Sequence, residues 1–217
     1  MNVAEGYKDK LVATKQAWAR AGRLLTGKVG DPEHDRLPPG QRLVQNWPVL
    51  DLGVHPAVAL EDWQLTVDGL VAAPLTWDWA GFMAQPQFDD VSDIHCVTQW
   101  SRYDNRWQGL STRHLLDLVR PLPEAAHLVL HAYDGYTTNL TLEQFSDVDC
   151  LIAHSHDGEP LSREHGGPAR LVIPRYYLWK SAKWLKRIEF VGAEQPGFWE
   201  NRGYHNFADP WLEQRYG

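Results

Sequence analysis

Between His165 and Lys186 the chain reads HGGPARLVIPRYYLWKSAKWLK. The apolar run 169–174 is typical of a short strand, and the glycines before it allow another group to approach the backbone closely. Four hydrogen-bond donors, charged or neutral, fall in the same segment: Arg170, Lys180, Ser181 and Lys183. This local excess of cations predicts a site for a phosphate or another oxyanion. The alternative is a solvated strand face on which Lys183 and Arg187 pair with nearby glutamates.

A cysteine precedes this segment by 69 positions. Cys96 lies in a strand-like run, residues 93–100, and we expect the polar stretch 101–106 after it to form a loop. Because functional sites are commonly built at strand ends, a thiolate here suits a nucleophile or a soft-metal ligand. The alternative, and the commoner role of a free cysteine, is that of a small buried hydrophobic residue.

The flanking sequence predicts an α+β body made mostly of short strands. Alternating apolar and polar residues over 63–71, with a turn at Asp68-Gly69, predict a hairpin. Further strands are expected at 127–133, 136–142, 151–154 and 169–174. Helices are expected at 77–84 and at 111–119, where Ser111 provides the cap, with a single helical turn at 141–145.

The two ends of the chain have different characters. Apolar spacing over 7–25 predicts an amphipathic helix, and the Pro-rich stretch 31–40 predicts a connector, so we divide the chain into 1–39 and 40–217. The C-terminal stretch has too many aromatic residues for a disordered tail, and we expect it to pack as ordered coil. Tyr204 and His205 within it are candidates to line a cleft or a dimer contact.

The composition limits the class of protein. A chain of 217 residues, 43% hydrophobic and with 11 tryptophans, is expected to fold as one domain. Its net charge of −7 argues against a nucleic-acid or anionic-lipid partner. The two cysteines are too few for a disulfide framework, and no apolar run reaches the ~18 residues of a membrane span, which favours a cytoplasmic protein with reduced thiols. The sequence contains no GxGxxG, P-loop, GxSxG or HExxH motif.

Several of these segments together resemble one known family. The run HCVTQWS at 95–101 and the later run at 165–186 resemble the molybdopterin-binding domain of the sulfite oxidase family. The upstream QNWPVL at 45–50 and the tail PGFWENRGYH at 196–205 are similar to its small stand-alone bacterial members. The resemblance covers about residues 40–217 with the motifs in the family's order. It implies an α+β sulfite oxidase-type fold, mostly short strands with a few helices and an N-terminal helical arm.

The resemblance also implies a molybdenum ion and a molybdopterin as cofactors. Cys96 matches the family's thiolate ligand of the metal, and a soft thiolate suits that ion. The residues that match the family's contacts to the pterin and its phosphate are Asn46, His165, Arg170, Lys180, Ser181, Ala182 and Lys183.

The expected reaction is oxygen-atom transfer to or from a small oxo-acid, sulfoxide or similar molecule. The residues expected to form the wall of the substrate cleft are His95, Gln99, Trp100, Tyr133 and Tyr177. Sulfite oxidases carry an arginine very soon after the cysteine, a position where this chain has Val97 to Trp100, and Arg102 and Arg106 are the candidates to replace it. Since the chain has no room for a haem domain, an external electron donor or acceptor is expected.

Two other functions stay open at this point. A cysteine hydrolase would use Cys96 with His165 as its base. A non-catalytic binding domain would keep the fold without the metal. Cys150 is expected to belong to the core.

Overall fold

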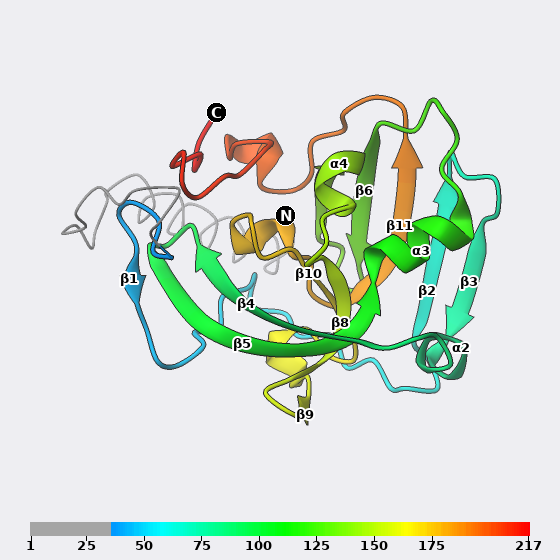
Figure 1. The fold of residues 1–217 in the computed structure, drawn as a ribbon, viewed down its shortest axis with the longest axis horizontal. Coiled ribbons are helices and arrows are strands. Elements are labelled where there is room, and N and C mark those ends of the chain that lie inside the picture. The colour runs from blue at the N-terminus through cyan, green and yellow to red at the C-terminus, as the bar shows by residue number, and fades with distance from the viewer. Residues whose placement is uncertain (1–35) are drawn as a thin grey trace, which may run out of the picture.

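The computed structural model describes residues 36–217. The expected helix at 7–25 and the first part of the connector lie outside this range. The described chain forms two sheets joined by short helices and a long C-terminal coil (Figure 1). This mostly-strand architecture confirms the expected fold class. No helix among residues 36–217 is long and apolar enough to cross a membrane.

The first sheet, sheet A, has six strands in the order β1-β5-β8-β10, with β4 paired to β5 and β9 to β8. Its strands are β1 (Arg42–Leu43), β4 (Phe88–Cys96), β5 (Trp100–Ser111), β8 (Leu151–His156), β9 (Glu159–Pro160) and β10 (Arg170–Val172). The long β4–β5 hairpin curves along one side of the molecule (Figure 1). It brings Cys96 and Trp100 opposite each other at the turn.

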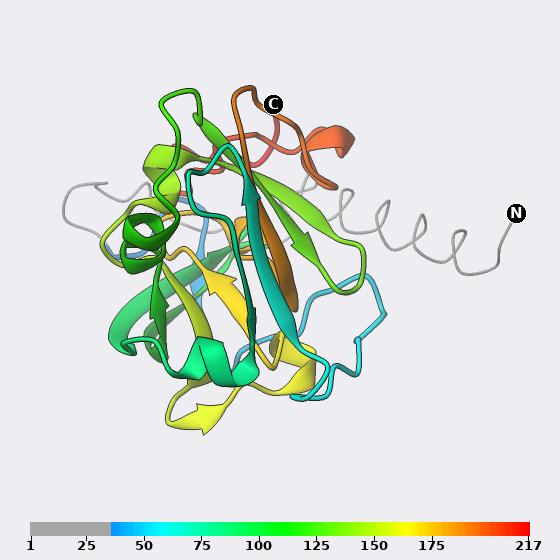
Figure 2. The same ribbon diagram turned by 90° about the vertical axis from the view of Figure 1, so that its right-hand side faces the viewer.

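The second sheet, sheet B, has five strands in the order β3-β2-β11-β6-β7. They are β2 (Gln64–Gly69), β3 (Leu75–Asp78), β6 (His127–Ala132), β7 (Thr137–Thr141) and β11 (Leu185–Val191). In Figure 2 these strands stand side by side and face the viewer. The helices are α2 (Trp79–Met83), α3 (Thr112–Val119) and α4 (Leu142–Phe145), and the 3₁₀ turns are η1 (Arg163–His165), η2 (Leu178–Lys180) and η3 (Glu200–Arg202).

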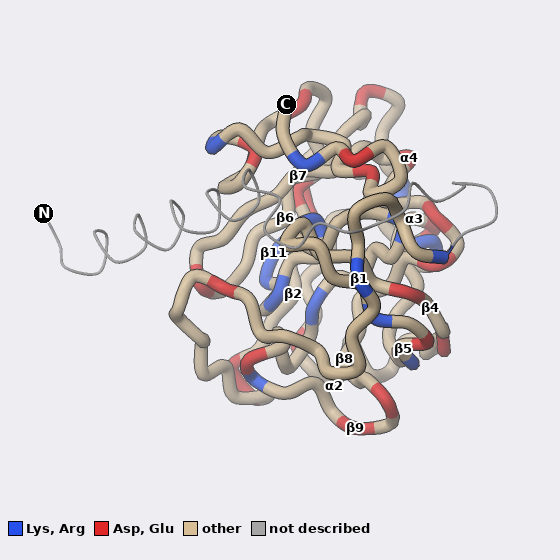
Figure 3. The backbone as a smooth tube through the Cα atoms, turned by 90° about the vertical axis from the view of Figure 1, so that its left-hand side faces the viewer, with Lys and Arg blue, Asp and Glu red and all other residues tan. Residues whose placement is uncertain are grey.

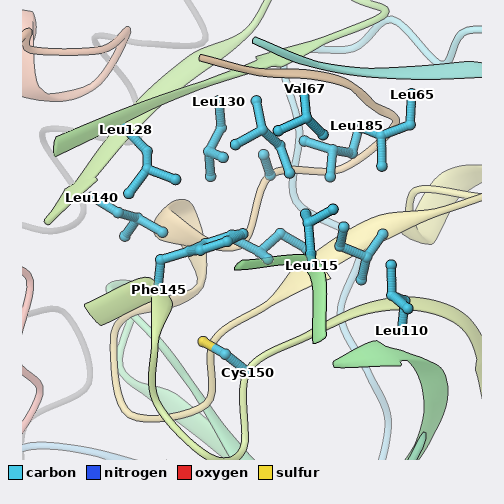
Figure 4. Packing of buried hydrophobic residues seen from close by; sticks show 14 of the residues in the cluster. Leu65, Val67, Leu110, Leu115, Leu128, Leu130, Leu140, Phe145, Cys150 and Leu185 are labelled. Carbon is cyan, nitrogen blue, oxygen red and sulfur yellow. The ribbon is translucent and has the colours of Figure 1, made fainter. Parts of the chain in front are cut away.

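The first core cluster lies between the two sheets and is closed by α3 and α4 (Figure 4). Sheet B contributes Leu65, Leu128 and Leu130, and sheet A contributes Leu110 and Ile152, all fully buried. Cys150, expected in the core, also belongs to this cluster. Figure 4 shows its sulfur beneath Leu115 and Phe145.

The second core cluster covers the other face of sheet A. Because successive side chains of a strand point to opposite faces, β10 sends Leu171 to the first cluster and Val172 to the second. The C-terminal coil completes the second cluster with Trp199 and Tyr204, so the predicted ordered tail is confirmed. The tail packs across one end of the molecule (Figure 1).

Three local predictions differ from the structure. The stretch 101–106 is part of β5 and not a loop, because its polar side chains are satisfied within the sheet: Ser101 pairs with His95, and Asn105 donates to two carbonyl groups. The hairpin of β2 and β3 exists, but Asp68 and Gly69 continue β2 beside β11, and the chain reverses at 70–74. Ser111 precedes α3 without a side-chain capping hydrogen bond.

The other predicted elements are confirmed with shifted ends. The helix expected at 77–84 is α2, which begins after Trp77 because that residue pairs in β3 and Asp78 caps the helix. The helical turn at 141–145 is α4, and Thr141 and Gln144 form a reciprocal capping box at its start.

Candidate functional site

A pocket of about 860 Å³, open solvent at its mouth included, lies beside the second core cluster. Segments far apart in the sequence form its wall: the loop after β1, the β4–β5 turn, β10, the residues between η2 and β11, and the tail. Seven residues singled out from the sequence line it: Cys96, Trp100, His165, Arg170, Ser181, Lys183 and Tyr204.

Cys96 ends β4 and is 6% exposed. Its Sγ lies 3.1 Å from the Thr98 hydroxyl in the tight turn that follows. Trp100, its partner across the hairpin, starts β5 and also lines the pocket. The thiol therefore lies at the end of a strand and forms part of the pocket wall, where a bound molecule can contact it.

Arg170 lies on the same face of β10 as Val172, which directs it toward the pocket. Its guanidinium donates to the carbonyl oxygens of His165 at 2.8 Å and Ser181 at 2.8 Å, and also to that of Leu171. Burial lowers its pKa to about 9. These bonds to the main chain fix a cation in a pocket wall of low polarity.

His165 is the last residue of η1, and its ring stacks on that of Trp47 with the ring centroids 3.9 Å apart. Its Nε2 lies 3.2 Å from the Trp47 carbonyl oxygen and its Nδ1 lies 2.9 Å from the Ser162 hydroxyl. The first contact requires Nε2 to donate, so Nδ1 accepts from the hydroxyl. Burial lowers the pKa of His165, which favours this neutral form.

Lys183 and Asp51 bring opposite charges to the pocket. The Lys183 Nζ donates to the Glu164 carbonyl oxygen at 2.6 Å and lies 3.6 Å from the Asp51 Oδ2. Burial alone would raise the pKa of Asp51, but the Gly53 amide, Lys183 and His55 outweigh it and lower that pKa. An ion pair therefore sits in the wall of the pocket.

Four residues predicted to contact the cofactor or to form the cleft wall do not line the pocket: His95, Tyr133, Asn46 and Lys180. His95 alternates with Cys96 along β4, so its Nδ1 meets the Ser101 hydroxyl at 2.8 Å on the opposite side. The Tyr133 hydroxyl bonds to the backbone of Gln64. Asn46 is exposed beside the pocket residue Trp47.

Lys180 is the fourth predicted residue that does not line the pocket. Its ammonium is completely buried and donates to Glu200 Oε1 at 2.7 Å and to both the carbonyl and the side-chain oxygen of Asn139. All three N–H groups of this side chain are used there. It therefore supports the pocket wall from behind and does not offer a donor to a ligand in the pocket.

Three further residues expected at the site are also missing from the pocket wall. Tyr177 is completely buried and stacks on Trp179 at 5.3 Å, so it lies behind the wall. Ala182 is buried and bonds through its backbone to Leu171. Gln99 occupies the β4–β5 turn with a φ of 67° and does not line the pocket.

Most of the aromatic residues in the pocket wall are not among the predicted site residues. The pocket residues not singled out include Trp47, Tyr136, Trp179, Trp184 and Trp199. All except Tyr136 fall inside the quoted motifs, so proximity to those motifs was the available signal. The sequence predicts Tyr136 only as part of a strand, whereas in the structure its hydroxyl donates to the Trp179 carbonyl oxygen at 2.6 Å.

Comparison with known proteins identifies a matching family and several relatives. A family model described as "Oxidoreductase molybdopterin binding domain" matches residues 52–199. The "Uncharacterized oxidoreductase YuiH" of Bacillus subtilis (strain 168) is 44% identical over 182 residues, which are 83% of this chain and 92% of that protein. The sulfite oxidase of Arabidopsis thaliana is 36% identical over 184 residues, 68% of this chain and 47% of that protein.

A more distant relative and a solved structure are also similar. The protein-methionine-sulfoxide reductase catalytic subunit MsrP of Ralstonia nicotianae is 28% identical over 153 residues, 63% of this chain and 46% of that protein. The sulfane dehydrogenase SoxCD from Paracoccus pantotrophus superposes with a TM-score of 0.59 at 22% identity, over 64% of this chain and 40% of that one. This last likeness is one of fold.

Proposed function

Since this chain belongs to the family of oxidoreductase molybdopterin-binding domains, we propose that it is a molybdenum–molybdopterin oxidoreductase that transfers an oxygen atom to or from a small substrate. We assign the cofactor to the unit 40–217, with 1–39 as an added arm. The chain spans about half the length of the sulfite oxidase and of the methionine-sulfoxide reductase that it matches, so the activity of the whole protein is part of this proposal.

One observation carries the proposal. Cys96, a soft donor suited to molybdenum, lines the same pocket as Arg170 and Lys183, which are cations suited to a phosphate. The aromatic residues of the wall, among them Trp47 and Trp184, offer flat apolar surfaces to a ring system. The donor set therefore fits a metal carried by a phosphorylated pterin.

The roles of the protein's own residues follow from their contacts. Cys96 would hold the metal as a thiolate, and Arg170 and Lys183 would bind the phosphate with help from Ser181 and the neutral His165. When bound, the cofactor supplies the redox change of two electrons and the oxygen-transfer chemistry. The protein fixes its orientation, and the aromatic wall limits the access of water to the thiolate.

Two finer points belong to the same proposal. We propose an external electron donor or acceptor. A cytoplasmic location is also proposed, and it is supported by the two cysteines, both of which are free thiols. Cell fractionation with an antibody against the chain tests the location.

The two alternative functions have less support. A cysteine hydrolase needs a base, but both ring nitrogens of His165 are engaged, by Ser162 and by the Trp47 carbonyl group. A non-catalytic domain would not require a soft thiol and two cations in one pocket wall, which is how Cys96, Arg170 and Lys183 are arranged.

Metal analysis tests the proposal. We expect protein from a molybdate-fed host to contain about one molybdenum and one releasable fluorescent pterin per chain. Cys96→Ser should lower the molybdenum content at least about tenfold while leaving the unfolding transition in place, because the serine hydroxyl is a poor ligand for this soft site.

Cys150→Ser is the matched control, since Cys150 is the other free cysteine and lies in the first core cluster, away from the pocket. It should retain molybdenum and pterin. A wild-type protein that lacks both under these conditions, or equal metal loss in the two variants, would refute the proposal.

A further inference from the structure

Asp51 brings a carboxylate into the part of the pocket wall that the proposed function assigns to a phosphate. Both Asp51 and Lys183 line the pocket, and the Lys183 Nζ lies 3.6 Å from the Asp51 Oδ2. Their side chains are 12% and 15% exposed, so a bound molecule can reach both of them. A phosphate that binds Lys183 therefore meets a second anion at the same cation.

The other arginines considered for the site do not remove this competition. Arg170 uses three of its five N–H groups for main-chain carbonyl oxygens, so it is held in place and cannot move to meet a phosphate. Arg102 and Arg106, the candidates from the sequence for a further positive charge near Cys96, do not line the pocket. Lys183 is therefore the cation for which a phosphate and the carboxylate compete.

Asp51 keeps other partners if a phosphate takes Lys183 from it. Its Oδ2 lies 2.6 Å from the Nε2 of His55, and its Oδ1 accepts a hydrogen bond from the Gly53 amide at 2.7 Å. Burial alone would raise the pKa of Asp51, but the Gly53 amide, Lys183 and His55 together lower it. The carboxylate therefore stays ionised near neutral pH, and losing the ammonium does not leave it unsatisfied.

Asp51 lies in a coil that side chains hold in place. Residues 45–58 form no strand or helix, and none of them makes a main-chain hydrogen bond to the main chain of another described residue. At one end the Trp47 ring stacks on His165, and at the other Arg163 donates to two carbonyl oxygens of the coil. Figure 2 shows the coil in light blue at the outside of the molecule. Between its two anchors, Asp51 can change partners without breaking a main-chain ladder.

We propose that Asp51 competes with a phosphate monoester for Lys183: the carboxylate pairs with the ammonium until the monoester binds it, and then turns to His55. In the proposed function, on which this rests, the monoester is that of the pterin. No covalent bond changes in this exchange. Because the phosphate must displace Asp51, its own contacts favour binding only a little, and the aromatic wall favours a phosphate attached to a ring.

Calorimetric titration with phenyl phosphate tests this on the full chain from a host that makes no molybdopterin. Asp51→Asn removes the competing charge and keeps the size of the side chain, so it should lower the Kd for phenyl phosphate about tenfold. The opposite sign is expected if Asp51 only holds the coil in place, because its loss would then loosen the site. An unchanged or higher Kd, or no detectable binding to the Asp51→Asn variant, overturns the inference.

Asp134→Asn is the matched control, since it removes the same charge from the same pocket wall. The Asp134 Oδ1 accepts a hydrogen bond from the Tyr136 amide at 2.9 Å, in the turn between β6 and β7. This substitution should lower the Kd for phenyl phosphate less than about threefold. Equal effects of the two variants would show that the overall charge of the wall, and not competition for Lys183, sets the affinity, and would overturn the inference.

The loaded enzyme gives an independent measurement. Release of the fluorescent pterin from the holoenzyme after dilution should be about tenfold slower in the Asp51→Asn variant than in the wild type. Faster release from the variant would overturn the inference as well. If the wild type from a molybdate-fed host holds neither molybdenum nor pterin, the proposed function fails, whereas the titration with phenyl phosphate still decides the role of Asp51.

Discussion

His156 carries no charge in the folded protein near neutral pH. Burial is the main cause that lowers its pKa to about 4; nearby Asp157 opposes this shift and Arg102 adds to it. Its ring centroid lies 4.5 Å from the ring centroids of both Trp47 and Trp107. Its Nε2 accepts a hydrogen bond from Arg102 at 3.0 Å. Protonation removes that acceptor and sets a positive charge beside the guanidinium.

This arrangement predicts a pH dependence of stability. The folded pKa lies below the unfolded value of 6.5, so the unfolded state binds more protons between the two. The contribution of His156 is fully present above about pH 6.5 and is lost as the pH falls toward 4. Urea unfolding at several pH values should show that the His156→Gln variant lacks this pH-dependent part of the free energy of unfolding, which is of order 3 kcal/mol. A pH profile unchanged by the substitution would contradict the assignment.

Cys96 and Arg170, which the sequence motifs predict as site residues, both line the pocket. Cys96 and Arg170 are unusual residues for their strands, so their types alone suggested a site. Lys180 has the same type as Lys183 and lies three positions away, but only its partner Glu200, 20 positions along the chain, makes it a buried structural cation. No local pattern encodes such a partner, and the same holds for Tyr133.

Among the elements, β2 shows how a turn signal can be overridden. Asp-Gly is a strong turn dipeptide, but Gly69 remains in the strand with a φ of 84° and pairs with Phe190 of β11. A Cβ added at Gly69 would lie 2.2 Å from the Phe190 carbonyl oxygen. Glycine is therefore required there both by its φ and by the close approach of β11.

A pair of glycine variants separates these two causes. Gly135 has nearly the same φ, 83°, but a Cβ there would meet nothing within 4 Å. We expect Gly135→Ala to lower the free energy of unfolding by about 1–2 kcal/mol through its backbone conformation alone. Gly69→Ala should cost clearly more because β11 must move, as urea titration would measure. Equal losses would show that the contact with β11 does not matter.

The strands and helices were largely predictable because apolar periodicity reports which face is buried. The stretch 101–106 was not, since β5 is an internal strand of sheet A whose polar residues find partners on β4 and β8. Ser101 and Asn105 are completely buried there. Their hydrogen bonds depend on strands that are adjacent only after folding, so a polar stretch looked like a loop.

For the molecule as a whole, one buried ion pair ties the C-terminal coil to the body. Lys180 and Glu200 have side chains with no exposure, and Glu200 Oε1 also accepts from Thr138 and from the Trp179 indole. The pair thus joins β7, η2 and η3 behind the pocket. Figure 3 marks the acidic and basic positions along the described backbone, most of which is uncharged.

Removing one charge of this ion pair should strongly destabilise the folded protein. Lys180→Met leaves a buried carboxylate unpaired and is expected to lower the free energy of unfolding by about 3–5 kcal/mol. Adding Glu200→Leu should recover part of the loss in a double-mutant cycle measured by urea unfolding. Lys186→Met, at an exposed position, is the control and should change stability by less than about 0.5 kcal/mol. Simple additivity of the two changes at the pair would contradict the coupling.

The positions of the tryptophans make cofactor binding visible in the fluorescence of the protein. Five of the 11, Trp47, Trp100, Trp179, Trp184 and Trp199, line the pocket. A bound pterin that absorbs in the near ultraviolet would lie within energy-transfer range of all five, whereas tryptophans such as Trp63 stay in the other core. The intrinsic emission of the chain is therefore an optical gauge of how much of a preparation carries its cofactor, and it reads occupancy without releasing the pterin.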